Sequence, residues 1–172
     1  AWRVLQRLEE VFSAPPPSNP EARLMTITDV VDRAVVILSA FAGLVAESTT
    51  RAFGWRFLEL GKRLERAHQL CILLRTALTH APFEVEPLLV ALLQIADSSI
   101  TYRTRYFSAL HPEYVLELLV ADGTNPRSLG FQLAALADHL DQLPKRWPGG
   151  SADPNALAQA ALESVRNVSG ED

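Results

Sequence analysis

The chain has 172 residues, enough for one domain with a buried core, and 48% of them are hydrophobic against 21% charged. Its 16 Lys and Arg against 20 Asp and Glu give a net charge of -4, which argues against binding to nucleic acid or to an anionic membrane. The longest nearly apolar run, 34–46, is shorter than the roughly 20 residues that cross a bilayer, so we expect no membrane span.

Apolar residues recur at helical spacing along almost the whole chain. A proline-rich stiff linker at 14–20 ends the first segment, and Thr26 or Thr28 is expected to cap the second, which reaches about Glu47. The predicted helices, in chain order, cover 2–12, 26 or 28 to about 47, 51–79, 84–96, 98–110, 112–121, 126–143 and 156–168.

The segment 51–79 predicts one long helix with apolar residues around most of its axis, which is typical of the central helix of a bundle. Short breaks between the later segments indicate packed neighbours, and Asn125 with Pro126 predicts a helix start. No alternating strand pattern is present in the sequence. The sequence therefore predicts an all-α fold, an antiparallel multi-helix bundle with a long central helix.

We expect two parts along the chain. Residues 1–147 form the bundle, and residues 148–172 hold a Gly/Ser/Pro linker, an Ala-rich terminal helix and a polar tail. The sequence begins without Met in a segment that already reads as helix, which suggests a piece of a longer protein. We find no secretory signal pattern, and the single Cys71 is expected to be a buried, inert thiol, which fits a cytoplasmic location.

Glu65 is the first polar residue of interest, because on the central helix it projects about 20° from Leu58 and Ile72. Its carboxylate is therefore expected to point partly into apolar surroundings and to need a cationic partner, since breaking a buried ion pair typically costs about 3 to 5 kcal/mol. In contrast, Glu59 and the basic residues that follow it, Lys62 and Arg63, are expected on an ordinary solvated face.

Two later clusters could supply that partner. In the first, Asp97, Thr101 and Arg105 share one helix face at four-residue spacing. In the second, Asp122 precedes the run 125–128 at a predicted helix N-terminus, whose free amides could also hold an anion.

Short runs in three ordered regions of the sequence, at 54–67, 98–103 and 125–133, then resemble a known family, the bacterial alpha-E domain, named for an alpha-helical fold with a Glu-Arg motif. The matching runs are Gly-Trp-Arg-Phe-Leu at 54–58, Leu-Glu-Arg-Ala at 64–67, Ser-Ser-Ile-Thr-Tyr-Arg at 98–103, Asn-Pro-Arg-Ser-Leu at 125–129 and Phe-Gln-Leu at 131–133. The resemblance spans about 1–143 and is placed on the C-terminal portion of the family pattern. A complete member also has an upstream helix with a related Leu-Gly-Arg and Glu-Arg pattern, which this sequence lacks.

The resemblance assigns the Glu-Arg pair to Glu65 and Arg66, which are the catalytic candidates. The family's basic positions before that pair fall on Lys62 and Arg63. Candidate ligand-binding residues come from the other motifs and from the polar clusters: Tyr102, Arg103, Arg105, Asn125, Arg127 and Ser128. No established reaction comes with the family.

The resemblance implies an association with ATP-grasp ligases and transglutaminase-like proteins in predicted amide-forming or peptide-processing systems. The first hypothesis is accordingly an accessory or interaction domain that docks to such a ligase and helps to position an acidic or peptide-like substrate. The second is an amide-chemistry enzyme in which Glu65 acts as acid or base and Arg66, Arg105 and Arg127 bind carboxylates. The third is a structural helical dimerisation module, so a homo-oligomer stays open.

Each of these candidates also has a structural interpretation. Glu65 and the arginines could form an ionic lattice that fixes helix register, and Tyr102 could be a core aromatic with its hydroxyl satisfied. His68 projects near the middle of the apolar stripe and is expected to be a satisfied core imidazole. The four histidines never recur at metal-binding spacing, so we expect neither a metal nor another cofactor.

Overall fold

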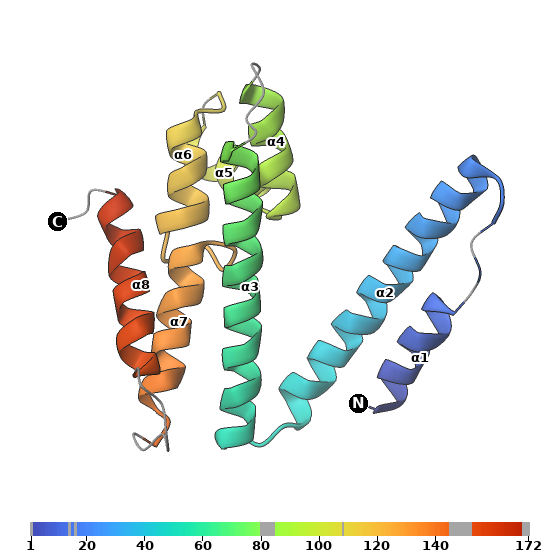
Figure 1. The fold of residues 1–172 in the computed structure, drawn as a ribbon, viewed down its shortest axis with the longest axis horizontal. Coiled ribbons are helices and arrows are strands. Elements are labelled where there is room, and N and C mark those ends of the chain that lie inside the picture. The colour runs from blue at the N-terminus through green and yellow to red at the C-terminus, as the bar shows by residue number, and fades with distance from the viewer. Residues whose placement is uncertain are drawn as a thin grey trace. The chain divides into compact units, whose positions relative to one another are not determined.

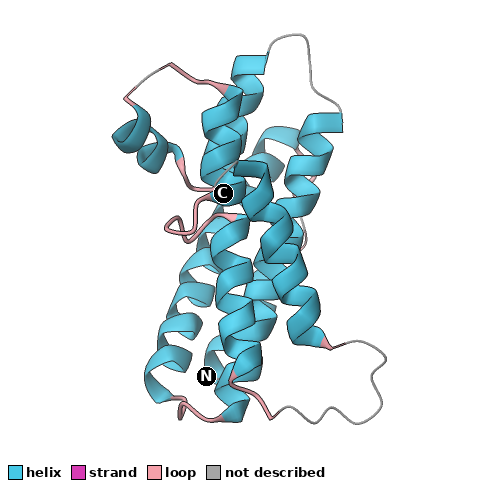
Figure 2. Ribbon diagram, turned by 90° about the vertical axis from the view of Figure 1, so that its left-hand side faces the viewer, coloured by secondary structure: helices cyan, strands magenta, loops and turns pink. Residues whose placement is uncertain are grey.

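The structure is a computed structural model that describes residues 2–13, 15, 17–79, 85–107, 109–144 and 153–169. All regular secondary structure within these ranges is helical, as Figure 2 shows, which confirms the predicted all-α fold. In these same ranges no helix has both the length and the apolar character that crossing a bilayer requires. The chain divides into two units, residues 1–51 and 52–172.

The first unit is a pair of packed helices, α1 (Trp2–Phe12) and α2 (Pro20–Ser48) (Figure 1). The predicted start of α2 is wrong. Asn19 caps the helix, its Oδ1 atom accepting a hydrogen bond from the Glu21 amide at 3.0 Å, and Pro20 occupies the first helical position, where its missing N–H costs nothing. Thr26 and Thr28 lie inside the helix and donate their hydroxyls to carbonyls one turn earlier.

The second unit is built around the long helix α3 (Phe53–Thr79). In chain order it continues with α4 (Val85–Ile95), α5 (Ser99–Tyr106), α6 (Pro112–Leu116), the π-helix η1 (Glu117–Ala121), α7 (Leu129–Asp141) and α8 (Pro154–Ser169). Helix α7 packs between α3 and α8, and α4 packs against the other end of α3 (Figure 1). This arrangement confirms the long central helix.

Two clusters of buried side chains hold this unit together. The larger joins α3, α4, α5, α6 and η1, with Leu74, Leu92, Tyr102 and Leu118 among its members. The smaller joins α7 and α8 through Leu133 and the α8 residues Leu162 and Val165. The terminal helix therefore belongs to the packed unit, while the boundary expected after Trp147 lies outside the described residues.

The predicted helix 112–121 changes its hydrogen-bond pattern halfway, from α in α6 to π in η1. A π segment widens the helix locally and commonly occurs at functional sites. Here it ends at Ala121, whose carbonyl oxygen would lie 2.8 Å from a Cβ atom added at Gly130. Because residue 130 has no side chain, the start of α7 can lie directly against the end of η1.

A candidate ligand-binding cleft

An open cleft of about 540 Å³ lies beside the central helix. One wall comes from the α3 segment that carries Glu65 and Arg66, and the other comes from the end of α4 and the loop that precedes α7. Apolar side chains that include Leu73 and Ile95 form much of its surface. The volume is within the range of about 300 to 1,000 Å³ that is common for small-molecule pockets.

Glu65 is exposed, and its Oε1 atom accepts a hydrogen bond from Nε2 of Gln69, one turn later on α3, at 2.9 Å. The prediction that its carboxylate is neutralised by an arginine was therefore wrong, because within the described residues its partner is an amide and not a guanidinium group. At 100° per residue, Glu65 projects about 140° from Leu60 and about 160° from Ala67, which are buried residues of α3. The packing of α3 therefore turns residue 65 toward the cleft.

The carboxylate that α3 does bury is that of Glu59, which is 8% exposed. Its Oε1 atom lies 2.7 Å from Nζ of Lys62, and its Oε2 atom lies 3.3 Å from Nη2 of Arg63. Burial raises the pKa of this carboxyl, but the hydrogen bond from Lys62 and the charges of Lys62 and Arg63 outweigh burial and leave the pKa below its ordinary value. The expectation of a solvated face was therefore wrong for Glu59 and Arg63, whereas Lys62 is exposed as expected.

Arg63 links this buried pair to the cleft. Its Nη1 atom lies 3.4 Å from Oε1 of Gln132, and its guanidinium carbon lies 5.6 Å from the centre of the Phe131 ring. Gln132 is 1% exposed, and its Nε2 atom donates to the carbonyl of Pro126 at 2.5 Å. A series of polar contacts thus runs from the buried carboxylate to the residue before Arg127, and it fixes the loop that carries Arg127.

Arg127 and Asp97 form an ion pair at the cleft, with Nη2 of the arginine 2.6 Å from Oδ2 of the aspartate. Both side chains remain accessible, at 46% and 76% exposure. Asp97 lies in the turn between α4 and α5 with a φ of 51°, a left-handed conformation that Asp tolerates better than most residues. Within the described ranges no carboxylate is paired with Arg66.

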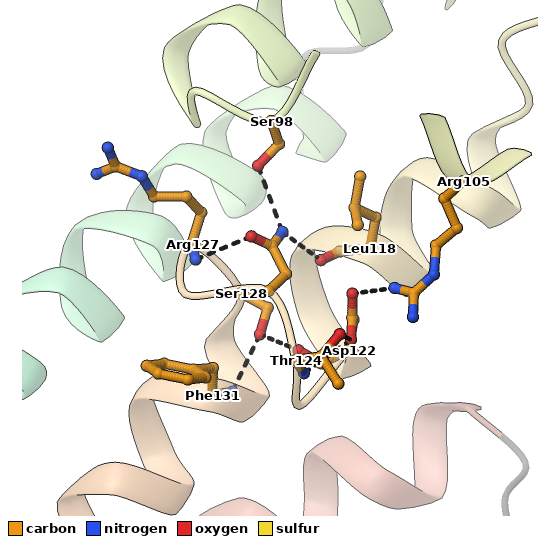
Figure 3. A network of polar contacts seen from close by, with 9 residues as sticks. Ser98, Arg105, Leu118, Asp122, Thr124, Arg127, Ser128 and Phe131 are labelled. Atoms are coloured by element: carbon orange, nitrogen blue, oxygen red, sulfur yellow. Dashed lines mark hydrogen bonds and ion pairs between the residues drawn. The ribbon is translucent and has the colours of Figure 1, made fainter. Parts of the chain in front are cut away.

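Two of the predicted binding residues, Asn125 and Ser128, instead hold the loop in place. Figure 3 shows Ser128 between Asp122 and Phe131. Asn125 is 3% exposed, and its Nδ2 atom donates to the Leu118 carbonyl at 3.0 Å and to Ser98 Oγ at 3.3 Å. Ser128 caps α7, its Oγ atom accepting from the Phe131 amide at 3.0 Å.

The expected helix start at Asn125 was therefore wrong. Helix α7 begins at Leu129, because Oδ1 of Asn125 accepts a hydrogen bond from the Arg127 amide at 3.0 Å and so forms a side-chain turn before the helix.

Arg105 and Arg127 lie on opposite sides of this loop, and Arg105 pairs with Asp122 (Figure 3). Asp122 also accepts hydrogen bonds from the amide and hydroxyl of Thr124 at 2.8 and 2.7 Å. Burial raises the pKa of Asp122, but the Thr124 hydrogen bonds and the Arg105 charge together leave it below its ordinary value. Arg105 is therefore a partner of the loop aspartate and not of Glu65.

Tyr102 and Arg103 line a separate, smaller pocket of about 250 Å³ beside α4 and α5. The Tyr102 side chain is 1% exposed, and its hydroxyl donates to the Ala109 carbonyl at 3.0 Å and accepts from the His111 amide at 3.1 Å. Tyr102 is therefore a core aromatic residue whose hydroxyl group is hydrogen-bonded, which is the structural alternative to a binding role. The second sequence motif thus contributes to the core and to a different pocket.

Two further expectations about α3 were wrong. His68 and Cys71 are both exposed, whereas the sequence predicted a core imidazole and a buried thiol. Among the described residues, no group of three or more His, Cys, Asp and Glu side chains is arranged to hold a metal ion.

The fold and the cleft define an all-helical domain in which residues of separate motifs meet beside a central helix. Residues 1–172 match the model of the Alpha-E family, described as a predicted alpha-helical domain with a conserved ER motif, and the chain belongs to this family. The family match covers the whole chain, whereas the resemblance inferred from the sequence motifs extended only to about residue 143.

Similar proteins are uncharacterized proteins of Mycobacterium bovis and of two strains of Mycobacterium tuberculosis. Each is 31% identical over 170 residues, which covers 96% of this chain and 19% of the relative. The chain therefore spans about a fifth of the length of these relatives. No solved structure matches the chain.

Proposed function

We propose that this chain is an accessory binding domain of an amide-forming, peptide-processing system, and that its cleft holds a carboxylate-bearing, peptide-like substrate for an ATP-grasp ligase. The observation that carries the proposal is that Arg66 and Arg127, from two separate motifs, line one cleft. Guanidinium groups suit this task because they bind carboxylates with two parallel hydrogen bonds. The link to a ligase comes from the family resemblance.

The apolar surface of the first unit supports the interaction half of this proposal. Helix α2 has a single buried residue, Ala34, while large apolar side chains that include Met25, Val31 and Val36 are exposed along it. Exposed apolar surface of this extent marks interaction sites in proteins. A ligase is the partner that we assign to it, and a second copy of this chain is the alternative that light scattering would reveal.

The test uses the full-length protein and an ATP-grasp ligase from the same organism. We expect the two to co-purify, and we expect peptide-dependent ADP release by the ligase to fall at least about tenfold when Arg66 and Arg127 are both changed to Gln. Arg75→Gln is the matched control, because it removes one exposed positive charge on α3 outside the cleft by the same substitution. Full ligase activity with the double variant, or after removal of this domain, would reject the proposal.

An enzymatic role for the domain is a distinct outcome of the same experiment. Conversion of a bound peptide by this chain alone, abolished in Glu65→Gln, would assign Glu65 an acid or base role and would replace the binding proposal. A cytoplasmic location is part of the proposal as well, because an exposed free thiol such as Cys71 persists best in a reducing compartment.

A further inference from the structure

We infer that the cleft recognises the C-terminal main-chain carboxylate of a peptide whose last residue is apolar, and that Asp97 occupies the carboxylate position until the ligand displaces it. This inference rests on the proposed function and names its substrate class. It starts from the ion pair between Arg127 and Asp97, in which an accessible carboxylate of the chain itself already fills the site that a ligand carboxylate would use.

The residues next to Asp97 indicate that the ligand has an apolar group beside its carboxylate. Ile95 and Ala96 line the apolar part of the cleft and directly precede Asp97, which holds the guanidinium group of Arg127. A charged acceptor thus lies next to an apolar surface. In a peptide ligand, the main-chain carboxylate of an apolar last residue combines these two features on one Cα atom.

The charges of the cleft limit how negative the ligand can be. Arg66 and Arg127 provide two positive charges, whereas Glu65 and Asp97 provide two negative ones. A ligand that displaces Asp97 from Arg127 still meets the Glu65 carboxylate, which repels a second anionic group and accepts N–H donors. One carboxylate together with amide N–H groups, as in a peptide C-terminus, satisfies this arrangement better than phosphate or a dicarboxylic acid.

Asp97 is suited to release Arg127. The pair is exposed on both sides, so its attraction is weak, worth at most about a fivefold change in an equilibrium constant. The backbone that carries the arginine stays in place when the pair opens, because the loop is held by the Asn125 and Gln132 hydrogen bonds. The ligand therefore competes with a weakly held carboxylate for an arginine that is anchored at the edge of the cleft.

The experiment measures binding of N-acetylated tripeptides ending in Leu, Lys or Glu to the full chain by calorimetry, each as the free acid and as the C-terminal amide. We expect the Leu free acid to bind best and its amide at least about tenfold more weakly. Arg127→Gln should remove that preference for the free acid. Equal binding of acid and amide, or tightest binding of the Glu-ending amide by its side chain, would overturn the inference.

Asp97→Asn is the decisive variant, because Asn keeps the size of the side chain and tolerates the left-handed turn while it removes the charge. We expect it to tighten binding of the Leu free acid about two- to fivefold and to leave the amide unchanged. Asp138→Asn, an exposed substitution of equal charge on α7, should change neither.

An unchanged affinity of Asp97→Asn for the Leu free acid would show that Asp97 does not compete with the ligand for Arg127. The proposed function is tested by the separate ligase experiment. It is rejected if the ligase neither co-purifies with the full-length protein nor depends on this domain for its activity.

Discussion

Glu59 and Arg63 face each other one turn apart on α3, with Oε2 of the glutamate 3.3 Å from Nη2 of the arginine and both side chains largely buried. This pair, and not the Glu65 side chain, is the ionic contact that the packing of α3 against α7 encloses. Arg63 also contacts Gln132 and the Phe131 ring of α7. The pair therefore joins the central helix to the helix whose first turn follows the Arg127 loop.

We predict that Glu59→Ala lowers the free energy of unfolding by about 2 to 4 kcal/mol, because it leaves the guanidinium group of Arg63 buried without its carboxylate. Urea denaturation measures the change. Glu65→Ala serves as the control, since its carboxylate is exposed and contacts Gln69 alone among the described residues, and it should change stability by less than about 0.5 kcal/mol. A larger loss in the control than in Glu59→Ala would contradict the assignment.

Acid should destabilise the second unit in two steps. Burial lowers the pKa of His139 below its ordinary 6.5, against the opposing charge of Glu59 and with the help of Arg56. The fold therefore favours the neutral imidazole, so its contribution is present above pH 6.5 and is lost as pH falls toward the lower folded pKa. The lowered pKa of Glu59 adds a contribution present above about 4.5 that is lost as pH falls through its folded value.

Urea denaturation from pH 8 down to about pH 3 tests this order. The wild type should begin to lose stability near pH 6.5, and His139→Gln should remove the loss that begins there while it keeps the loss at lower pH. His68→Gln changes an exposed histidine and should follow the wild-type profile. A first loss of stability in His139→Gln at the same pH as in the wild type would show that another group titrates there.

Gly130→Ala should be destabilising by about 1 to 3 kcal/mol, because the added methyl group meets the Ala121 carbonyl oxygen at 2.8 Å and neither backbone can yield without moving η1 from α7. Gly61→Ala is the matched control. An added Cβ there meets open space on α3, so the substitution should stabilise the chain by up to about 1 kcal/mol. Thermal unfolding measures the change in stability of both variants. A change of the same sign in both would argue against the close approach of η1 to α7 at Gly130.

Asn125→Ala should lower the free energy of unfolding by about 2 to 3 kcal/mol, because it leaves the buried Leu118 carbonyl without the Asn125 donor and releases the Arg127 amide. Peptide binding in the cleft should weaken as well, since Arg127 loses its fixed position. Asn167→Ala on the exposed face of α8 should leave both quantities unchanged. Retention of full stability in Asn125→Ala would show that the loop is held by other contacts.

Cys71 should react with Ellman's reagent in the native state within minutes, at the rate of an exposed thiol. The measurement is the absorbance of the released thiolate with and without denaturant. Reaction only after denaturation would support the buried thiol that the sequence suggested, and it would indicate that a further segment or partner covers this face of α3.

Much of the helical arrangement follows from the sequence, because apolar spacing and proline positions are local properties. The first helix, the long central helix and the alanine-rich terminal helix were all predicted. Helix starts were less predictable: Asn19, Pro20 and Ser128 compete with equally suitable residues nearby, and the choice depends on which backbone groups the tertiary structure leaves unpaired.

The candidate site was predictable only in part. Two separate motifs indicated Arg66 and Arg127, and the structure brings both to one cleft. It also directs Arg105 to Asp122 and places Tyr102 in the core. The pattern of the motifs could not separate these roles, because residues on the same short helix or loop point in different directions once its neighbours are in place.

The sequence by itself determined the helical class, the central position of α3 and the regions that carry the polar motifs, since these depend on composition and on helical periodicity. Only the tertiary structure decided which carboxylate of α3 is buried. Glu59 and Glu65 lie on one helix with apolar neighbours, and the packing of α3 against α7 buries the first and leaves the second at the cleft. The pairing of Arg127 with Asp97 likewise depends on the loop that Asn125 and Gln132 hold in place.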